Sequence, residues 1–189
     1  MKYRFNSLTA AHISQRKSVQ EVCRQFSRSP SKGNLKRLKT LFGQCGEQVI
    51  IESGFHLDYG SQVIVGDRTY ININCTFLDG LNDLVGDNQL NLDESNASIF
   101  IGSDCLIGPN VQLLSVSHDI DPNLRQAQKY NYVESITLAD NVWLGAGVIV
   151  LAGVTIGKNS VIGAGSVVTK NVAENSFYAG NPAIKIKSL

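Results

Sequence analysis

The sequence predicts a mainly β protein whose short strands wind into a parallel β-helix. Three observations support this fold: aliphatic residues recur every six positions, glycine often follows them, and charged residues are scarce. Charged residues make up 17% of the chain and aromatic residues 7%, whereas hydrophobic residues make up 43%. A narrow column of stacked coils holds Val, Ile and Leu better than large rings. The 189 residues are enough for one such domain with an appendage.

The six-residue repeat is most regular near the C-terminus, and it recurs in two shorter runs upstream. The aliphatic positions are Leu138, Leu144, Val150, Ile156, Ile162 and Val168, preceded by Val65, Ile71, Phe77 and then Ile101, Ile107, Leu113. In the C-terminal run a small or β-branched residue stands two positions before each of them. A period of six fits neither an amphipathic helix nor a simple strand pair. It fits coils of three short strands and three turns, so we expect these side chains to point into the coil.

Glycine directly follows six of these aliphatic residues, at positions 66, 102, 108, 145, 157 and 163. Glycine adopts backbone angles that other residues avoid. We therefore expect these six residues to supply the demanding φ and ψ angles of the turns between strands.

Two segments interrupt the repeat, and a third precedes it. Residues 79–96 hold five acidic and no basic residues, and residues 115–135 are polar and aromatic, with Pro122 as a breaker. Residues 1–48 are expected to form an N-terminal helical cap, with helices over 8–28 and 34–42 that cover one open end of the coil. Residues 49–189 form the predicted β-helix, with excursions at 79–96 and 115–135. Loops that project from a rigid solenoid often carry function.

The net charge of +1 excludes a polybasic nucleic-acid binder. It is nevertheless the sum of two unequal parts. Residues 1–48 hold ten basic and two acidic residues, a net charge of +8, and the remainder carries −7. The basic segment is interpreted either as a solvated helical face packed near an acidic body or as an arm that recruits an anionic ligand.

The four cysteines, Cys23, Cys45, Cys75 and Cys105, include no CxxC pair, so we expect no zinc site and no redox dithiol. No apolar leader segment begins the chain. The uncharged stretch 142–157 is too short and too rich in glycine to span a membrane. These features favour a cytoplasmic protein without a membrane span.

Several strings resemble one known family. They are FHLDYGSQVIVGDRTYININCTFLDG (55–80), IGPNVQLLSVSHDIDPNLR (107–125) and the segment from ADNVWLGAG to YAGNPA (139–183), together with LKRLKTLFGQCGEQVIIESGF (35–55). This combination is similar to the hexapeptide-repeat O-acetyltransferases of the maltose/galactoside acetyltransferase group. The resemblance implies a left-handed β-helix, a homotrimer with active sites between neighbouring subunits, and acetyl-CoA (coenzyme A) as the acetyl donor, with no metal.

The resemblance implies that His118 is the catalytic base. It stands in the loop that follows a run of coils, and an ordinary imidazole pKa near 6.5 suits a base at neutral pH. The family usually has proline directly after this histidine, whereas Asp119 stands here. The expected mechanism is direct attack of the acceptor hydroxyl in a ternary complex. A covalent cysteine intermediate is disfavoured, because Cys75 and Cys105 fall in register with the repeat. His12 and His56 are expected to be structural.

The remaining site residues are carried over by position from the family. The acceptor pocket is expected at Asp58, Tyr70, Asn72 and Asp79, although Asn and Asp are also common turn residues. Coenzyme A is expected to contact Trp143, Gly145 and Ala146 near its thiol end, and Ala164, Thr169 and Lys170 further along. Lys185 and Lys187 are additional candidates for its phosphates.

The predicted function is therefore transfer of an acetyl group from acetyl-CoA to a hydroxyl of a sugar or related small molecule. An N-acetyltransferase acting on an amino-sugar and a non-catalytic β-helix assembly subunit are the alternatives. A metal-dependent hydratase is disfavoured, because the three histidines lie in unrelated motifs. The acceptor itself stays open, since the two excursions that would shape its pocket are the parts least similar to the family.

Overall fold

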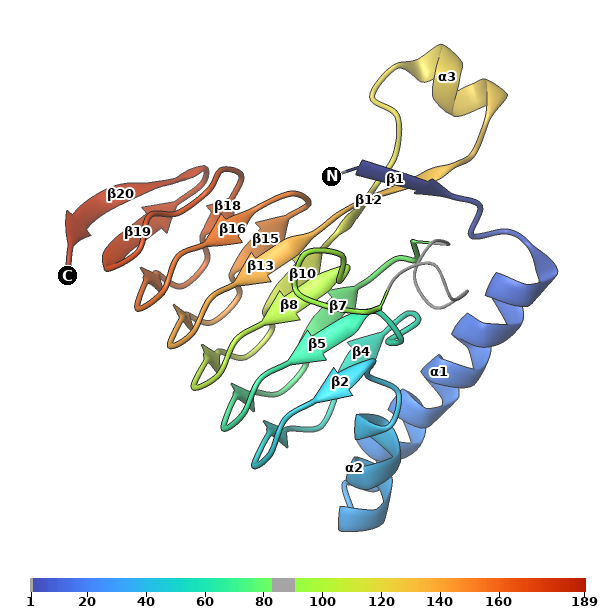
Figure 1. Ribbon diagram of the computed structural model, residues 1–189, viewed down its shortest axis with the longest axis horizontal. Coiled ribbons are helices and arrows are strands. Elements are labelled where there is room, and N and C mark those ends of the chain that lie inside the picture. The colour runs from blue at the N-terminus through green and yellow to red at the C-terminus, as the bar shows by residue number, and fades with distance from the viewer. Residues whose placement is uncertain (1, 83–90) are drawn as a thin grey trace.

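The computed structural model describes residues 2–82 and 91–189, which form a parallel β-helix with helices against its first coils (Figure 1). Each coil contributes one short strand to each of three sheets, and the coils stack with their backbones paired in parallel. Residues 83–90, within the predicted excursion 79–96, lie outside the described residues. The excursion leaves the coil after β7 (Thr76–Leu78) and rejoins it at β8 (Ile99–Ile101).

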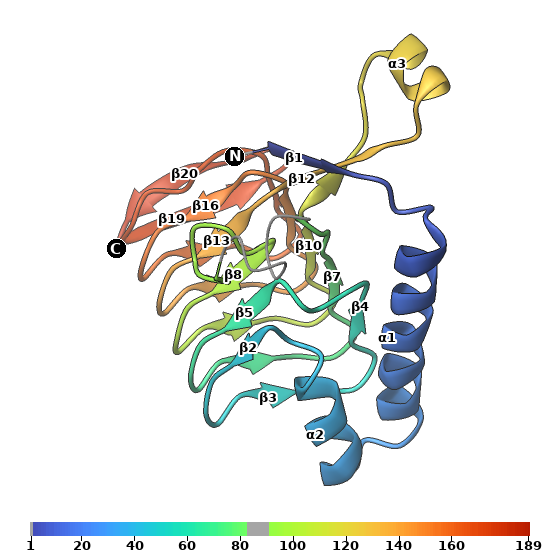
Figure 2. The same cartoon turned by 45° about the vertical axis from the view of Figure 1, so that its right-hand side comes forward.

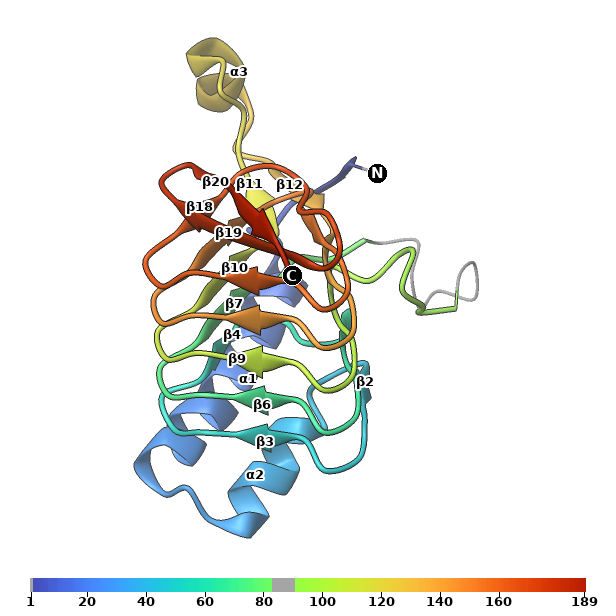
Figure 3. The same ribbon diagram turned by 90° about the vertical axis from the view of Figure 1, so that its left-hand side faces the viewer.

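The three sheets differ in length and in what ends them. The first has the order β18-β15-β10-β7-β4 and the second β16-β13-β8-β5-β2, whereas the third, β20-β19-β17-β14-β9-β6-β3, is extended by a C-terminal antiparallel hairpin (Figure 3). The other strands of the first sheet are β4 (His56–Leu57), β10 (Gln112–Leu114), β15 (Ile149–Leu151) and β18 (Val167–Val168). Those of the second are β2 (Gln44–Cys45), β5 (Val63–Val65), β13 (Ile136–Leu138) and β16 (Thr155–Ile156). The third comprises β3 (Ile50–Ile51), β6 (Tyr70–Ile71), β9 (Leu106–Ile107), β14 (Trp143–Leu144), β17 (Val161–Ile162), β19 (Ser176–Gly180) and β20 (Ala183–Ser188).

The inward column predicted from the repeat is confirmed. All twelve aliphatic and aromatic repeat residues, from Val65 to Val168, are at most 1% exposed and belong to one continuous core. Full burial of one such side chain stabilises a fold by about 1.5–3 kcal/mol. The column is therefore the main source of cohesion between coils.

The expected role of the six repeat glycines is wrong. None of them adopts a positive φ; such angles occur at other glycines and at corner residues such as Asn74 and Asn141. Glycine is needed because the next coil passes too close for a side chain. A Cβ on Gly66 would lie 2.5 Å from the backbone carbon of Gly102, and one on Gly145 would lie 2.6 Å from the backbone nitrogen of Ala164. Asn and Asp tolerate the left-handed corners, which leaves glycine free for the sites of close approach.

The N-terminal segment forms the two predicted helices, α1 (Ala10–Arg28) and α2 (Lys32–Lys39), but also an unpredicted strand, β1 (Lys2–Phe5). The hydroxyls of Thr9 and Ser31 accept from backbone N–H groups and cap the two helix starts. The buried face of α1 and α2 joins the inward column, and α1 contacts β4 (Figure 2). The β-helix itself begins at β2, five residues before the predicted start at residue 49.

The second excursion is a projecting loop on a small sheet of its own. Strands β11 (Val116–Ser117) and β12 (Asn131–Glu134) form its neck, and β1 pairs with β12 on the other side (Figure 1). A short helix, α3 (Pro122–Ala127), lies in the loop. Pro122 starts this helix, capped by the Asp121 carboxylate, so its predicted role as a breaker is wrong.

No helix within residues 2–82 and 91–189 has the length and hydropathy of a membrane span.

The contacts at the glycines predict that Gly66→Ala lowers the free energy of unfolding by about 1–3 kcal/mol, because the new methyl group meets backbone atoms that cannot rotate away. Thermal unfolding followed by circular dichroism measures the change. Gly33→Ala in α2 is the matched control, since a Cβ there meets only the Ser31 hydroxyl at 3.9 Å. Equal stability of the two variants would contradict the role given to close coil packing.

Candidate active site

One outward row of side chains crosses the third sheet, and we call it the outward ladder. Each member precedes a residue whose side chain faces the core, so strand alternation turns it to the surface. The backbone register aligns Ile50, Tyr70, Leu106, Trp143, Val161 and Phe177 on successive strands. Trp143, the single tryptophan, is 53% exposed on this surface, and Leu106 beside it is 52% exposed. Apolar side chains left exposed in register indicate a binding surface.

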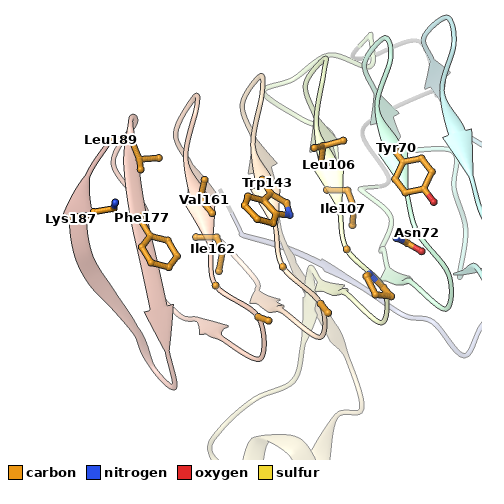
Figure 4. Close-up of a pocket in the computed structure, with 16 residues that line it drawn as sticks. Tyr70, Asn72, Leu106, Ile107, Trp143, Val161, Ile162, Phe177, Lys187 and Leu189 are labelled. Carbon is orange, nitrogen blue, oxygen red and sulfur yellow. The ribbon is translucent and has the colours of Figure 1, made fainter.

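A groove of about 800 Å³ runs beside this ladder (Figure 4). The ladder from Tyr70 to Phe177 forms one part of its wall, and the small residues that follow the repeat positions form another. Four of the predicted coenzyme A residues, Trp143, Gly145, Ala146 and Ala164, line it. The sequence reasoning missed Leu106, Val161 and Phe177. A position directly before a repeat residue is the signal that would have identified Leu106 and Val161, whereas Phe177 lies beyond the repeat.

The backbone of the groove offers hydrogen-bond donors at the coil corners. The amide of Gly145 is already used, because it donates to the carbonyl of Ile162 at 2.8 Å in the ladder between coils. Among the described residues, the amides of Ala146 and Ala164 have no acceptor. Of the two residues expected near the thiol end of coenzyme A, Ala146 therefore has a backbone amide available for a ligand and Gly145 does not.

The predicted phosphate-binding residues lie towards the C-terminal coils. Lys187 lines the groove, whereas Thr169, Lys170 and Lys185 are exposed outside its lining. Lys187 and Lys185 both belong to β20 and pair with Phe177 and Tyr178 of β19. Of the two lysines in this tail, the geometry thus favours Lys187 as the cation of the groove.

Two of the predicted acceptor residues, Tyr70 and Asn72, line the same groove, near its N-terminal end. The Tyr70 hydroxyl donates to Glu52 at 3.3 Å, and partial loss of solvent raises the pKa of Tyr70. Asp58 lies elsewhere, at the end of β4 on the first sheet. Its carboxylate accepts from the Gln20 amide at 3.2 Å and lies 3.4 Å from Nε2 of His56.

Asp79 is fully buried, and its carboxylate binds the backbone of residues 58–60. Its Oδ1 accepts from the backbone amides of Asp58 and Tyr59 at 3.0 Å each, and its Oδ2 accepts from that of Gly60 at 2.7 Å. Burial raises the pKa of Asp79 to about 6, and the three amide donors act against the rise. No surface of this side chain is left for an acceptor in the single chain. We therefore propose a structural role for Asp79 in place of acceptor contact.

His118 directly follows β11 and is exposed, outside the lining of the groove. Its Nδ1 lies 3.1 Å from the carbonyl oxygen of Tyr130. A carbonyl oxygen only accepts, so Nδ1 carries a proton, and in the neutral form of the imidazole Nε2 then holds the lone pair. The single chain thus prepares an imidazole with a free basic nitrogen but does not place it in the groove.

The cysteines are buried in structural positions, apart from the half-buried Cys45. Burial raises the pKa of Cys75 and of Cys105 to about 11. A thiol with such a pKa is almost fully protonated at neutral pH and is a poor nucleophile. Within the described part of the chain, no cluster of His, Cys, Asp or Glu has the arrangement of a metal site.

Comparisons with known proteins agree with this geometry. Residues 135–170 match the family model described as bacterial transferase hexapeptide (six repeats). The galactoside O-acetyltransferase of Lactococcus lactis is 36% identical over 87% of this chain and 72% of its own length. The chain belongs to the hexapeptide-repeat acetyltransferases of the maltose/galactoside O-acetyltransferase group.

Solved structures extend the likeness to the whole fold. A hexapeptide-repeat acetyltransferase of Vibrio cholerae in complex with acetyl coenzyme A has a TM-score of 0.82 and 31% identity, covering 98% of this chain and 92% of its own. A maltose O-acetyltransferase of Clostridium difficile has a TM-score of 0.83 and 31% identity, with the same coverage. Family membership confirms the predicted left-handed β-helix and identifies the chain as an acyltransferase.

The buried carboxylate leads to a prediction for Asp79→Asn. An asparagine amide group presents a donor to at least one of the three backbone amides, which leaves that buried N–H unsatisfied at a cost of about 1–3 kcal/mol. We expect a lower melting temperature by differential scanning calorimetry. Glu174→Gln, which removes an exposed carboxylate, is the control and should leave the melting temperature unchanged. An unchanged melting temperature with a raised KM for the acceptor would instead favour acceptor contact.

Proposed function

We propose that the protein transfers an acetyl group from acetyl-CoA to a hydroxyl of a sugar or related small molecule, with His118 as the general base. The family is named for O-acetyl transfer to galactosides and maltose, and the relative from Vibrio cholerae is a complex with acetyl coenzyme A. The observation that carries the proposal is the imidazole of His118, whose Nδ1 is held by the Tyr130 carbonyl. This contact fixes the tautomer in which Nε2 can accept a proton.

The groove provides the complementary half of the site. Its apolar ladder, with Trp143 at the centre, suits the pantetheine arm of coenzyme A, and Lys187 at its C-terminal end suits a phosphate. The free amide of Ala146, three residues after Trp143, belongs to the same groove and can donate to the oxygen of a thioester. Such a donor stabilises the negative charge that develops on this oxygen during acyl transfer.

The reaction then follows from these groups. Nε2 of His118 takes the proton of the acceptor hydroxyl as its oxygen attacks the thioester carbonyl. The carbonyl oxygen becomes an oxyanion, to which the Ala146 amide donates. When the tetrahedral intermediate collapses, the C–S bond breaks, the acetyl ester forms, and the imidazolium returns its proton to the leaving thiolate. The buried, protonated thiols of Cys75 and Cys105 favour this direct transfer over a cysteine intermediate.

We further propose that the working enzyme is a homotrimer whose sites combine the groove of one chain with His118 of a neighbour. His118 lies outside the lining of the groove of its own chain, and α3 in the same loop has no buried residue. Ile120, 95% exposed, and Leu124, 55% exposed, are apolar side chains on this loop that a neighbouring copy would cover. A cytoplasmic location stays a prediction.

The first test is His118→Ala, which should lower turnover by about 10²–10⁴-fold, because no other base replaces Nε2. Free thiol released from acetyl-CoA in the presence of a panel of sugar and amine acceptors measures the rate and identifies the acceptor. Acetyl-CoA binding should persist, seen as a change in the fluorescence of Trp143, the single tryptophan. Turnover at the wild-type level in this variant would refute His118 as the base.

The second test asks whether His118 and Trp143 act from different chains. His118→Ala and Trp143→Ala chains, each defective alone, are co-expressed with different tags, and the mixed oligomers are purified. Every cyclic trimer that contains both chain types has one intact site of three, so the purified mixture should show about a third of the wild-type activity. Activity of the mixture equal to the mean of the two variants would show that both residues serve one chain's own site.

A further inference from the structure

The neck of the loop that carries His118 lies in the three-stranded sheet β1-β12-β11, outside the coils. Strand β11 runs directly into His118, and β12 directly follows Tyr130, the acceptor of its Nδ1. The two ends of the loop are thus held by antiparallel pairs, Val116 with Val133 and Ser117 with Tyr132. The position of the imidazole therefore depends on this sheet and not on the β-helix alone.

The small sheet is anchored to the coil by a second hydrophobic cluster. Phe5 of β1 and Val133 of β12 are buried against Tyr59 and Leu81. Gly80 permits the contact, since a Cβ there would lie 2.4 Å from a methyl group of Val133. Through this cluster the N-terminal strand, 130 residues away in sequence, becomes part of the support for the loop.

Two side-chain contacts hold the residues next to the imidazole. The Tyr132 hydroxyl donates to Oδ2 of Asp119 at 2.9 Å, and Asp119 is the residue that directly follows His118. The guanidinium of Arg4, on β1, lies 4.5 Å from the centre of the Tyr130 ring, and Tyr130 supplies the carbonyl that Nδ1 contacts. The Tyr132–Asp119 contact thus restrains the backbone next to His118, and the Arg4–Tyr130 contact restrains the residue whose carbonyl accepts from Nδ1.

Further contacts hold Tyr132 and Asp119 in place. The ammonium of Lys2 lies 4.5 Å from the centre of the Tyr132 ring and 3.4 Å from Glu134. On the far side, Arg125 donates to the backbone carbonyl of Asp119 at 2.8 Å. The Asp119 carboxylate also raises the pKa of Tyr132, which keeps its hydroxyl protonated and donating. A proline after His118 would restrict the backbone through its ring. In this chain the hydrogen bond from the Tyr132 hydroxyl to Asp119 restrains the same position instead.

We propose that Tyr132, acting through Asp119, and Arg4 of β1, acting on Tyr130, are positioning residues that hold Nδ1 of His118 on the Tyr130 carbonyl. This inference rests on the proposed function, in which Nε2 of His118 is the base. In this proposal Tyr132, Asp119 and Arg4 do not touch the reacting atoms. They select the imidazole tautomer and orientation, so their removal lowers the rate of the chemical step and leaves the groove intact.

The central variant is Tyr132→Phe, which removes one hydroxyl and keeps the ring beneath Lys2. We expect kcat to fall roughly tenfold, because small displacements of a catalytic group are costly, while KM for acetyl-CoA and the fluorescence response of Trp143 stay unchanged. Tyr3→Phe is the matched control: Tyr3 pairs with Val133 in the same sheet, and no hydrogen bond of its hydroxyl occurs within the described residues. It should retain the wild-type kcat.

The partner residue gives an independent measurement. Asp119→Ala should reproduce the loss, Asp119→Asn should retain most of the activity because its amide oxygen still accepts, and the double variant Tyr132→Phe/Asp119→Ala should lose no more than the larger single loss. Additive losses in the double variant would overturn the proposed action of Tyr132 through Asp119. Because the Asp119 variants change no core contact, they test the proposal even where Tyr132→Phe fails to fold.

A spectroscopic readout separates this inference from the proposed function. In ¹⁵N NMR of histidine-labelled protein, wild-type His118 should show the Nδ1–H tautomer, and Tyr132→Phe and Arg4→Gln should show a mixture with the Nε2–H tautomer. This outcome supports the positioning role even if His118→Ala proves active. An active His118→Ala variant would refute only the assignment of His118 as the general base. A pure Nδ1–H tautomer and wild-type kcat in Tyr132→Phe, with His118→Ala inactive, would overturn the positioning role alone.

Discussion

The close approach of successive coils is the constraint on which the rest of the structure depends. Parallel strands in a sheet are separated by about 4.8 Å, so each coil must repeat the path of the one before it. This spacing stacks the inward side chains of successive coils into one column and removes the room for a Cβ where backbones pass most closely, as at Gly66 and Gly145. It also places left-handed residues at equivalent corners, where the amide side chains of Asn141, Asn159 and Asn175 hydrogen-bond in series.

The same constraint produces the functional surface. A residue that precedes an inward residue must point outward, and the register between coils aligns five such residues from Tyr70 to Phe177. The corners after the inward residues carry glycine and alanine, so the backbone is accessible there and its amide at Ala146 stays free. An extended apolar groove with a backbone donor is thus a direct consequence of regular stacking, and needs no loop to build it.

This dependence explains how much the sequence could predict. The repeat predicts the fold and the inward column, because both follow from one period, and the family resemblance adds the expected position of Trp143. It does not predict that β1 pairs with β12, since that contact joins Arg4 to Tyr132 across the whole chain and no period relates them. The contacts of Asp79 are not predictable for a similar reason: a carboxylate that accepts from three amides of another coil is indistinguishable, in sequence, from one that faces a ligand. The glycines were assigned a conformational role because sequence reports the missing side chain but not the neighbour that requires its absence.

The base and the groove therefore rest on different kinds of structure. The groove is part of the repeat and is as rigid as the stacked coils, whereas His118 stands on a small sheet whose cohesion comes from a few contacts, those of Phe5, Tyr132 and Asp119 among them. Such a division allows the acceptor site to change without loss of the coenzyme site, because the loop and its neck can vary while the period of the coils is kept. It also makes the N-terminal strand a part of the support for the loop that carries His118. In the proposed trimer, an imidazole presented away from its own groove has to keep its orientation until a neighbouring chain supplies the groove, and the contacts at the neck are placed to hold it in that state.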